Sequence, residues 1–209
     1  MEELDKVLQA LSVVERYEEY LFRKTWGRVL IVIGTVLPLG ALVSMNAAIV
    51  AEVIGLDAGF ISILANLMAV ILCFGSVAYT FFGAWGTPKT RSEEEPTDTK
   101  HGPIIGIVWF VCFVLTGLAP ESLTIVSLLW AAGASCLLTF MILRTVGSHG
   151  EVRILLYLSL SLFLSSIPLL LFLDTILLGY LALVAFSVCF ILAGIAMNRM
   201  AAEMLKSPA

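Results

Sequence analysis

The side chains that could carry chemistry are few in this chain, and most stand apart from one another. Its two histidines are His101 and His149. A catalytic interpretation would pair His149 with Ser148 or Glu151, but a base seldom works productively with its immediate neighbours in a short loop. A tight turn explains the glycine-containing segment 147–153 better. We therefore expect no catalytic residue and no enzymatic activity.

Cysteine is the other residue type with reactive or metal-binding chemistry. Cys73, Cys112, Cys136 and Cys189 all fall within apolar segments, and no two of them form a CxxC pair. Cysteine in a packed interior usually serves as a small apolar residue. The chain also lacks a phosphate-binding glycine loop and a nucleophile elbow. We expect no metal site, no cofactor and no nucleic-acid partner.

Two pairs of uncharged polar residues stand out within the apolar segments. Ser44 and Asn46 precede an acidic loop, and Ser62 and Asn66 follow it. An amide left unpaired in hydrocarbon is costly, so these side chains should bond one another or face a cavity. We favour a clamp that joins two helices by hydrogen bonds, a common use of Asn and Ser in membranes. The alternative is an outward-facing pocket that binds a neutral polar ligand.

The framework that holds these residues has the composition of a membrane protein. The chain has 209 residues, of which 60% are hydrophobic and 13% charged, whereas soluble domains are about half apolar and about a quarter charged. Crossing the membrane takes about 20 apolar residues, and strands are excluded because the apolar runs do not alternate. The sequence therefore predicts an all-α polytopic membrane protein, a bundle of six transmembrane helices in three hairpins. The six runs are Val29–Ala51, Ala58–Trp85, Pro103–Ala119 (the shortest), Leu123–Leu143, Ile154–Leu173 and Thr175–Met197.

The positions of the basic residues predict how these helices are oriented. All twelve Lys and Arg lie before the first run, after the sixth, or in the second and fourth gaps. The other three gaps contain acids and no base. The positive-inside rule then places both termini in the cytoplasm of a multi-pass protein in the cell membrane. Asp57, Glu121 and Asp174 stand where runs two, four and six begin, so we expect them to cap those helices.

The chain divides into four parts. We expect a cytoplasmic amphipathic helix at 1–26, a first transmembrane hairpin at 27–86 and transmembrane helices three to six at 103–209. The part at 87–102 is charged, contains proline and cannot bury a core, which is typical of a mobile cytoplasmic linker.

The N-terminal helix needs something on which to lay its apolar stripe. Residues 2–20 carry six acids against two bases, which disfavours flat binding to an anionic leaflet. We expect docking on protein, either on this chain's own loops or on a partner; a helix that merely anchors the first span is an equal alternative. Trp26 and the bases around it fit the headgroup layer. The stripe comprises Leu4, Val7, Leu11, Val14 and Leu21, at helical spacing.

One further candidate site and a candidate function remain. Arg144, His149 and Arg153 lie in or beside one loop and together would suit a lipid phosphate. The runs contain essentially no side chain that could couple transport to ions or protons. We predict a non-enzymatic accessory or scaffold subunit in the lipid bilayer, bound to another membrane protein or to itself. The alternative is a protein that binds or transports a small molecule.

Overall fold

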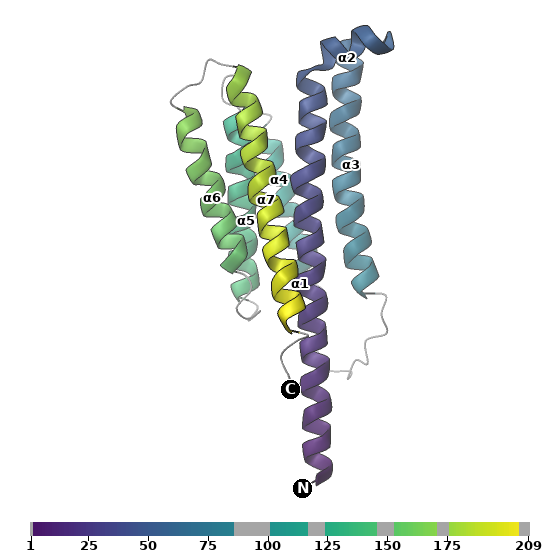
Figure 1. The fold of residues 1–209 in the computed structure, drawn as a ribbon, viewed down its shortest axis with the longest axis vertical. Helices are drawn as coiled ribbons and strands as arrows, with labels where there is room; N and C mark the ends of the chain where they lie inside the picture. The colour runs from purple at the N-terminus through teal and green to yellow at the C-terminus, as the bar shows by residue number, and fades with distance from the viewer. Residues whose placement is uncertain (1, 86–100, 117–123, 146–152, 171–175, 205–209) are drawn as a thin grey trace.

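In the computed structural model, every helix or strand among the described residues is an α-helix (Figure 1). The structure describes residues 2–85, 101–116, 124–145, 153–170 and 176–204. Six of the helices correspond to the six apolar runs, and a short one, α2, is additional. The helices are α1 (Glu2–Met45), α2 (Ala47–Ile54), α3 (Ala58–Trp85), α4 (His101–Thr116), α5 (Thr124–Thr145), α6 (Arg153–Leu170) and α7 (Ile176–Met204).

Several of these helices have the length and composition of a membrane span. The described residues contain four candidate spans, or five if α2 and α3 are counted together as one bent span. The apolar part of α4, Ile104–Thr116, is shorter, which reflects the short third run. A helical protein with several candidate spans is thus confirmed, whereas the count of six crossings stays a prediction. The four single spans are Glu19–Met45, Val126–Thr145, Arg153–Leu170 and Leu177–Met204.

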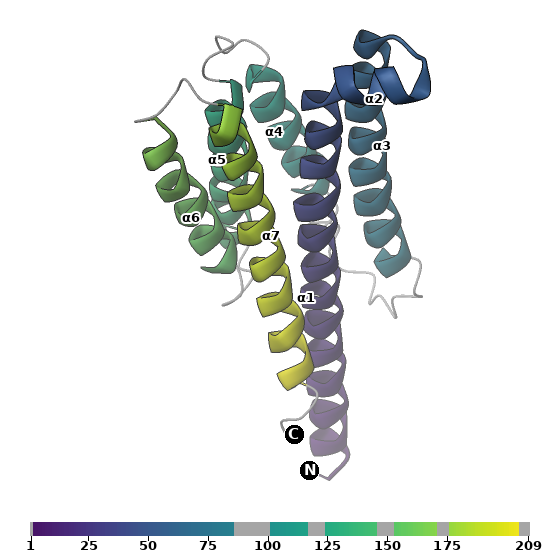
Figure 2. The same ribbon diagram turned by 45° about the horizontal axis from the view of Figure 1, so that its top comes forward.

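α1 continues without interruption through residue 26, where we expected a separate amphipathic helix to end. Residues 2–26 contain neither glycine nor proline, so nothing in their sequence breaks the helix. Arg23 donates a hydrogen bond to Glu19 at 2.7 Å, one turn earlier. The helical N-terminal segment and the first candidate span therefore form one rod, whose start extends beyond the other described helices (Figures 1 and 2).

Trp26 corrects our expectation of a headgroup anchor. Only 4% of its surface is exposed, and its ring lies 6.2 Å from that of Phe22. It belongs to the same apolar core as Leu30 and Met197. Because α7 runs alongside α1 as far as Met204 (Figure 1), protein covers Trp26 where we expected lipid headgroups.

α1 lies between α3 and α7 and packs closely on both. A Cβ added at Gly194 of α7 would lie 2.5 Å from the carbonyl oxygen of Gly27, and one added at Gly34 would lie 2.7 Å from Cβ of Phe190. On the other side, a Cβ added at Gly40 would overlap Cβ of Ala69 in α3. Glycine is therefore required at these crossings because the helix backbones touch.

The remaining helices extend the bundle beyond α7. α6 contacts α7 and α5, and α4 contacts α5. Trp109 of α4 donates a hydrogen bond to Thr139 of α5 at 3.0 Å, and Ser159 of α6 donates one to the Gly133 carbonyl of α5 at 2.8 Å. Such bonds suit a bundle in lipid, where burial of apolar surface does not by itself favour helix association.

α2 is the element that the hydropathy pattern missed. The first apolar run continues to Ala51, but α1 ends at Met45 and the chain turns at Asn46. α2 then lies across the end of α3, with a bend of 110° between the two (Figure 2). Gly55 ends α2 in the left-handed region (φ 77°), where glycine is favoured. Asp57 accepts a hydrogen bond from the Phe60 amide at 2.9 Å, which confirms its predicted capping role; Glu121 and Asp174 lie outside the described residues.

Candidate functional site

A polar cluster joins α1 to α3 near the end of the bundle that carries α2. The hydroxyls of Ser44 and Ser62 are hydrogen-bonded at 2.5 Å. The Asn66 side-chain nitrogen donates to the Ser44 hydroxyl and to the Ser62 carbonyl, both at 3.0 Å. The bonds of Ser44 to Ser62 and to Asn66 join α1 to α3, which confirms the predicted clamp for three of its four residues. Each such bond in a membrane contributes about 0.6 kcal/mol and rarely more than about 1.7 kcal/mol.

Asn46 makes a different contact from the one expected. Its side-chain nitrogen donates to the Leu42 carbonyl at 2.8 Å, and its side-chain oxygen accepts from the Tyr180 hydroxyl at 2.9 Å. The asparagine thus joins the turn between α1 and α2 to α7, whereas Asn66 joins α3 to α1. Tyr180 was missed because it is 134 residues away in sequence. Its place near the start of the last run was the only signal available.

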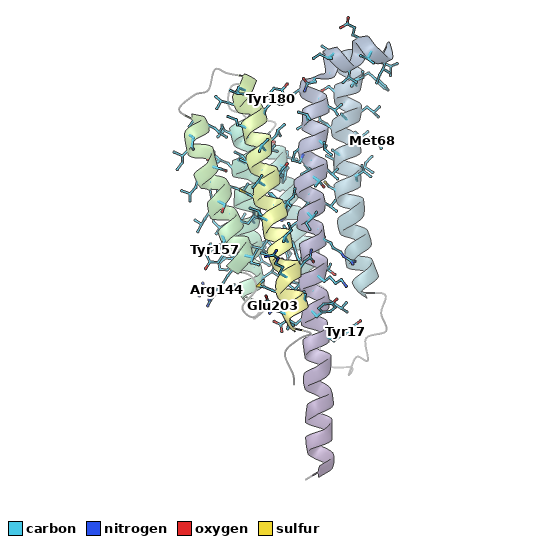
Figure 3. All side chains as sticks on the ribbon, in the orientation of Figure 1. Tyr17, Met68, Arg144, Tyr157, Tyr180 and Glu203 are labelled. Carbon is cyan, nitrogen blue, oxygen red and sulfur yellow. The ribbon has the colours of Figure 1, made fainter. Side chains whose placement is uncertain are left out.

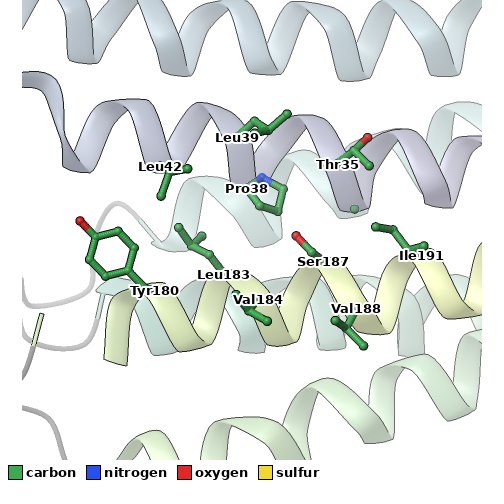
Figure 4. Close-up of a pocket in the computed structure, with 11 residues that line it drawn as sticks. Thr35, Pro38, Leu39, Leu42, Tyr180, Leu183, Val184, Ser187, Val188 and Ile191 are labelled. Carbon is green, nitrogen blue, oxygen red and sulfur yellow. The ribbon is translucent and has the colours of Figure 1, made fainter. Parts of the chain in front are cut away.

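A groove of about 380 Å³ lies between α1 and α7, with Tyr180 toward one end of it (Figure 4). Its walls are apolar apart from Tyr180, Thr35 and Ser187. Pro38 also lines it, and because proline has no amide hydrogen, the carbonyl four residues earlier lacks its usual helical donor. None of the four residues predicted to bind a polar ligand lines this groove. The surface of the groove is mainly apolar.

The predicted lipid-phosphate site is described only in part. Arg144 lies in the last turn of α5, and Arg153 begins α6. Both side chains are exposed, and His149 lies outside the described residues. Figure 3 places Arg144 toward the end of the bundle that also holds Glu203 and Tyr17. The two arginines therefore share one end of the α5–α6 hairpin, as a phosphate site there would require.

The apolar stripe of the N-terminal helix lies on the part of α1 that extends beyond the bundle. The backbone of α1 is helical from Glu2, so Leu4, Val7, Leu11 and Val14 share one face by register. Leu21, the last residue of the stripe, is half-buried where the bundle begins. No other described helix lies beside the first turns of α1 (Figures 1 and 2).

The four cysteines lie on four different helices, α3, α4, α5 and α7. Cys136 is fully buried in the apolar core, in keeping with cysteine as a small apolar residue. Among the described residues, no group of three His, Cys, Asp or Glu side chains is placed to hold a metal ion.

Comparisons with known proteins add no family to these observations. No protein-family model matches the chain, and no curated protein or solved structure matches it.

Proposed function

We propose that this chain is a non-enzymatic accessory or scaffold subunit that binds a protein partner through the N-terminal extension of α1. The observation that carries the proposal is the continuity of α1. One helix includes both the extension, with its stripe of apolar positions, and the span Glu19–Met45. An amphipathic helix needs a surface against which to bury its apolar stripe, and no other described helix lies beside the first turns of α1 (Figures 1 and 2).

Charge indicates what kind of surface the extension would bind. Residues 2–20 carry six acids and two bases, so two copies of the segment would repel each other and an anionic leaflet would repel both. A protein groove with an apolar floor and basic rims fits this helix better than a second extension does. We infer that the partner is a different protein, bound on the side of the membrane where the N-terminus lies.

The arrangement in the membrane is part of the same proposal. We infer that α4 completes a sixth crossing, because an even number puts both termini on one side, as the basic residues require. That side is the cytoplasm, and the bilayer is the cell membrane. Arg144, His149 and Arg153 would then lie at the cytoplasmic headgroups, where lipid phosphates are available.

The docking proposal is tested by adding equal charge to opposite faces of the extension. The test variant carries Leu4→Asp and Leu11→Asp within the stripe. The control carries Gln9→Asp and Ser12→Asp, at positions about 80–160° around the helix from Leu4 and Leu11. The complex is cross-linked in native membranes, solubilised and sized. We expect the stripe variant to migrate as the free chain and the control to keep the mass of the complex.

Two results would contradict docking by the stripe. One is an equal loss of the complex in both variants, which would indicate that charge alone matters. The other is an unchanged complex in the stripe variant. The fold of each variant is checked by its elution and melting temperature, because the extension lies outside the bundle and its substitutions should leave the melting temperature unchanged.

A second candidate function is favoured by the groove between α1 and α7. Its volume of about 380 Å³ falls in the range of small-molecule sites, and its mainly apolar lining suits an acyl chain or a similarly apolar molecule. Val184→Trp would fill the groove, whereas Leu192→Trp places the same side chain at an exposed site of α7 that does not line it. Native mass spectrometry should show a bound small molecule lost only from Val184→Trp. Equal occupancy in both variants would exclude the groove.

A further inference from the structure

We propose that α2 is an interfacial helix, whose apolar flank inserts among the lipids of the leaflet opposite the N-terminal extension. The inference does not depend on what the extension binds. It rests on the orientation of α2, on its exposed side chains and on the position of its single charge.

The orientation follows from the bend between α2 and α3. The bend is 110°, so α2 departs by 20° (110 minus 90) from the perpendicular to α3. A helix nearly perpendicular to a membrane span lies nearly in the membrane plane. Figures 1 and 2 show α2 at the end of the bundle farthest from the N-terminus. It therefore lies at the level where hydrocarbon gives way to headgroups.

The large side chains of α2 are mostly uncovered by the rest of the chain. Val53 is 82% exposed, Ile49 64% and Ile54 60%. Ala47, by contrast, is buried and marks the side of α2 that turns toward the bundle. Ala47 thus lies against protein, whereas the side chains of Ile49, Val53 and Ile54 are mostly left uncovered by it. In water this would be unfavourable, at roughly 25 cal/mol for each Å² of apolar surface.

The one charge of α2 indicates which side of the helix meets water. Glu52 lies two residues from both Val50 and Ile54, and two residues correspond to about 160° around a helix. When the exposed Glu52 carboxylate faces water, Val50 and Ile54 face the bilayer, Val53 lies about 100° from Glu52 at the boundary, and Ile49 lies about 60° from it on the water side. This is the amphipathic division expected of a helix that lies in the interface. α2 has no basic residue, so its insertion depends on apolar burial and needs no anionic lipid.

Lipid is the occupant that the neighbouring surface favours. The flank of α2 continues into α3, where Phe60, Ile63 and Leu67 are more than half exposed on an apolar helix. A stable protein interface usually buries at least about 1,000 Å². A helix of 8 residues is by itself too small to provide this area. Gly55 and the Asp57 cap hold the turn, so the flank keeps its direction.

The test places a photoreactive phenylalanine analogue at single positions in the full chain. Val53 and Ile54 probe the apolar flank, Glu52 is the matched neighbour, and Ile63 is the reference for a lipid-facing site. Each variant is reconstituted in phosphatidylcholine nanodiscs and irradiated, and adducts are identified by mass spectrometry. We expect positions 53 and 54 to give lipid adducts in yields close to that of position 63, and position 52 to give several-fold less. Adding phosphatidylserine should leave these yields unchanged.

Three outcomes would overturn the proposal. The first is a yield at 53 and 54 as low as at 52, which would mean that water surrounds the whole helix. The second is cross-linking of these positions to a second copy in place of lipid. The third is a yield at 63 no higher than at 52, because α3 would then not present its apolar face to lipid.

Discussion

The crossing of α1 and α7 allows a sharp prediction about stability. A Cβ added at Gly194 would lie 2.5 Å from the carbonyl oxygen of Gly27 and 2.6 Å from a side-chain carbon of Ile31. The first of these contacts is with backbone, so the two helices must separate to admit a methyl group. Gly75 in α3 is the matched control, because a Cβ added there has no atom within 4 Å.

The expected magnitudes follow from two opposing effects. Alanine is favoured over glycine inside a helix by about 1 kcal/mol, and both variants gain this amount. Overpacking a tight contact costs about 1–3 kcal/mol, and more when backbone must move. Gly75→Ala should thus be neutral or stabilising by up to about 1 kcal/mol, and Gly194→Ala destabilising by about 1–2 kcal/mol.

The assay is the free energy of unfolding of the full chain in lipid bicelles, measured by steric trapping for both variants and the parent. The difference between Gly194→Ala and Gly75→Ala should be about 1–3 kcal/mol, in the direction of a less stable Gly194→Ala. If Gly194→Ala matched or exceeded the parent, the reasoning would be refuted, since α1 and α7 would then not meet backbone to backbone at this crossing.

Two further predictions concern the polar cluster. Ser44→Ala removes a partner of both Ser62 and Asn66, so it should lower the free energy of unfolding by about 1 kcal/mol. Ser161→Ala is the control and should change the free energy of unfolding little, because the Ser161 hydroxyl bonds the Tyr157 carbonyl within α6. Equal effects of the two substitutions would argue against the clamp. Tyr180→Phe combined with Asn46→Ala in a double-mutant cycle should give a coupling of about 0.6 kcal/mol, and a coupling of zero would mean that this bond does not stabilise the bundle.

The sequence was sufficient to predict the helical class and one clamp. Hydropathy depends on local composition, and every apolar run does correspond to a helix. Ser44, Ser62 and Asn66 were predicted to meet because they flank one short loop, which limits how far apart two consecutive helices can place them. Asp57 was predicted as a cap for a similarly local reason. In each of these correct predictions, the interacting residues lie close together in the sequence.

The features that the sequence did not predict are of two kinds. Some are contacts between residues far apart in sequence, and others depend on whether a side chain faces lipid or protein. The Tyr180–Asn46 contact and the Gly194–Gly27 crossing join opposite ends of the chain, and no periodicity within one helix determines them. A glycine within an apolar run does not by itself indicate a helix crossing, because a Cβ added at Gly75 or Gly106 would have no neighbour within 4 Å. The Trp26 side chain suits lipid headgroups and a protein interior equally well. In the fold it is buried in the core that also holds Met197 of α7.

The break after Met45 shows why hydropathy alone could not position α2. The apolar run from Val29 continues through Ala51, so its composition is the same whether the last residues cross the membrane or lie along it. Asn46 and Gly55, the residues that bound α2, were the available signals. Either one is common in membrane helices without a break, and only the two together delimit a separate short helix.

The position of α1 ties these features into one mechanical unit. Among the described helices, α3 contacts only α1 and α2, and α2 contacts only α1 and α3. α1 therefore links the α2–α3 unit to α7 and the rest of the bundle. The close crossings at Gly40 and Gly194 leave little room for α1 to slide along α3 or α7, because closely packed helices resist displacement. We therefore expect a partner that tilts the N-terminal extension to move α1 and the attached α2 together.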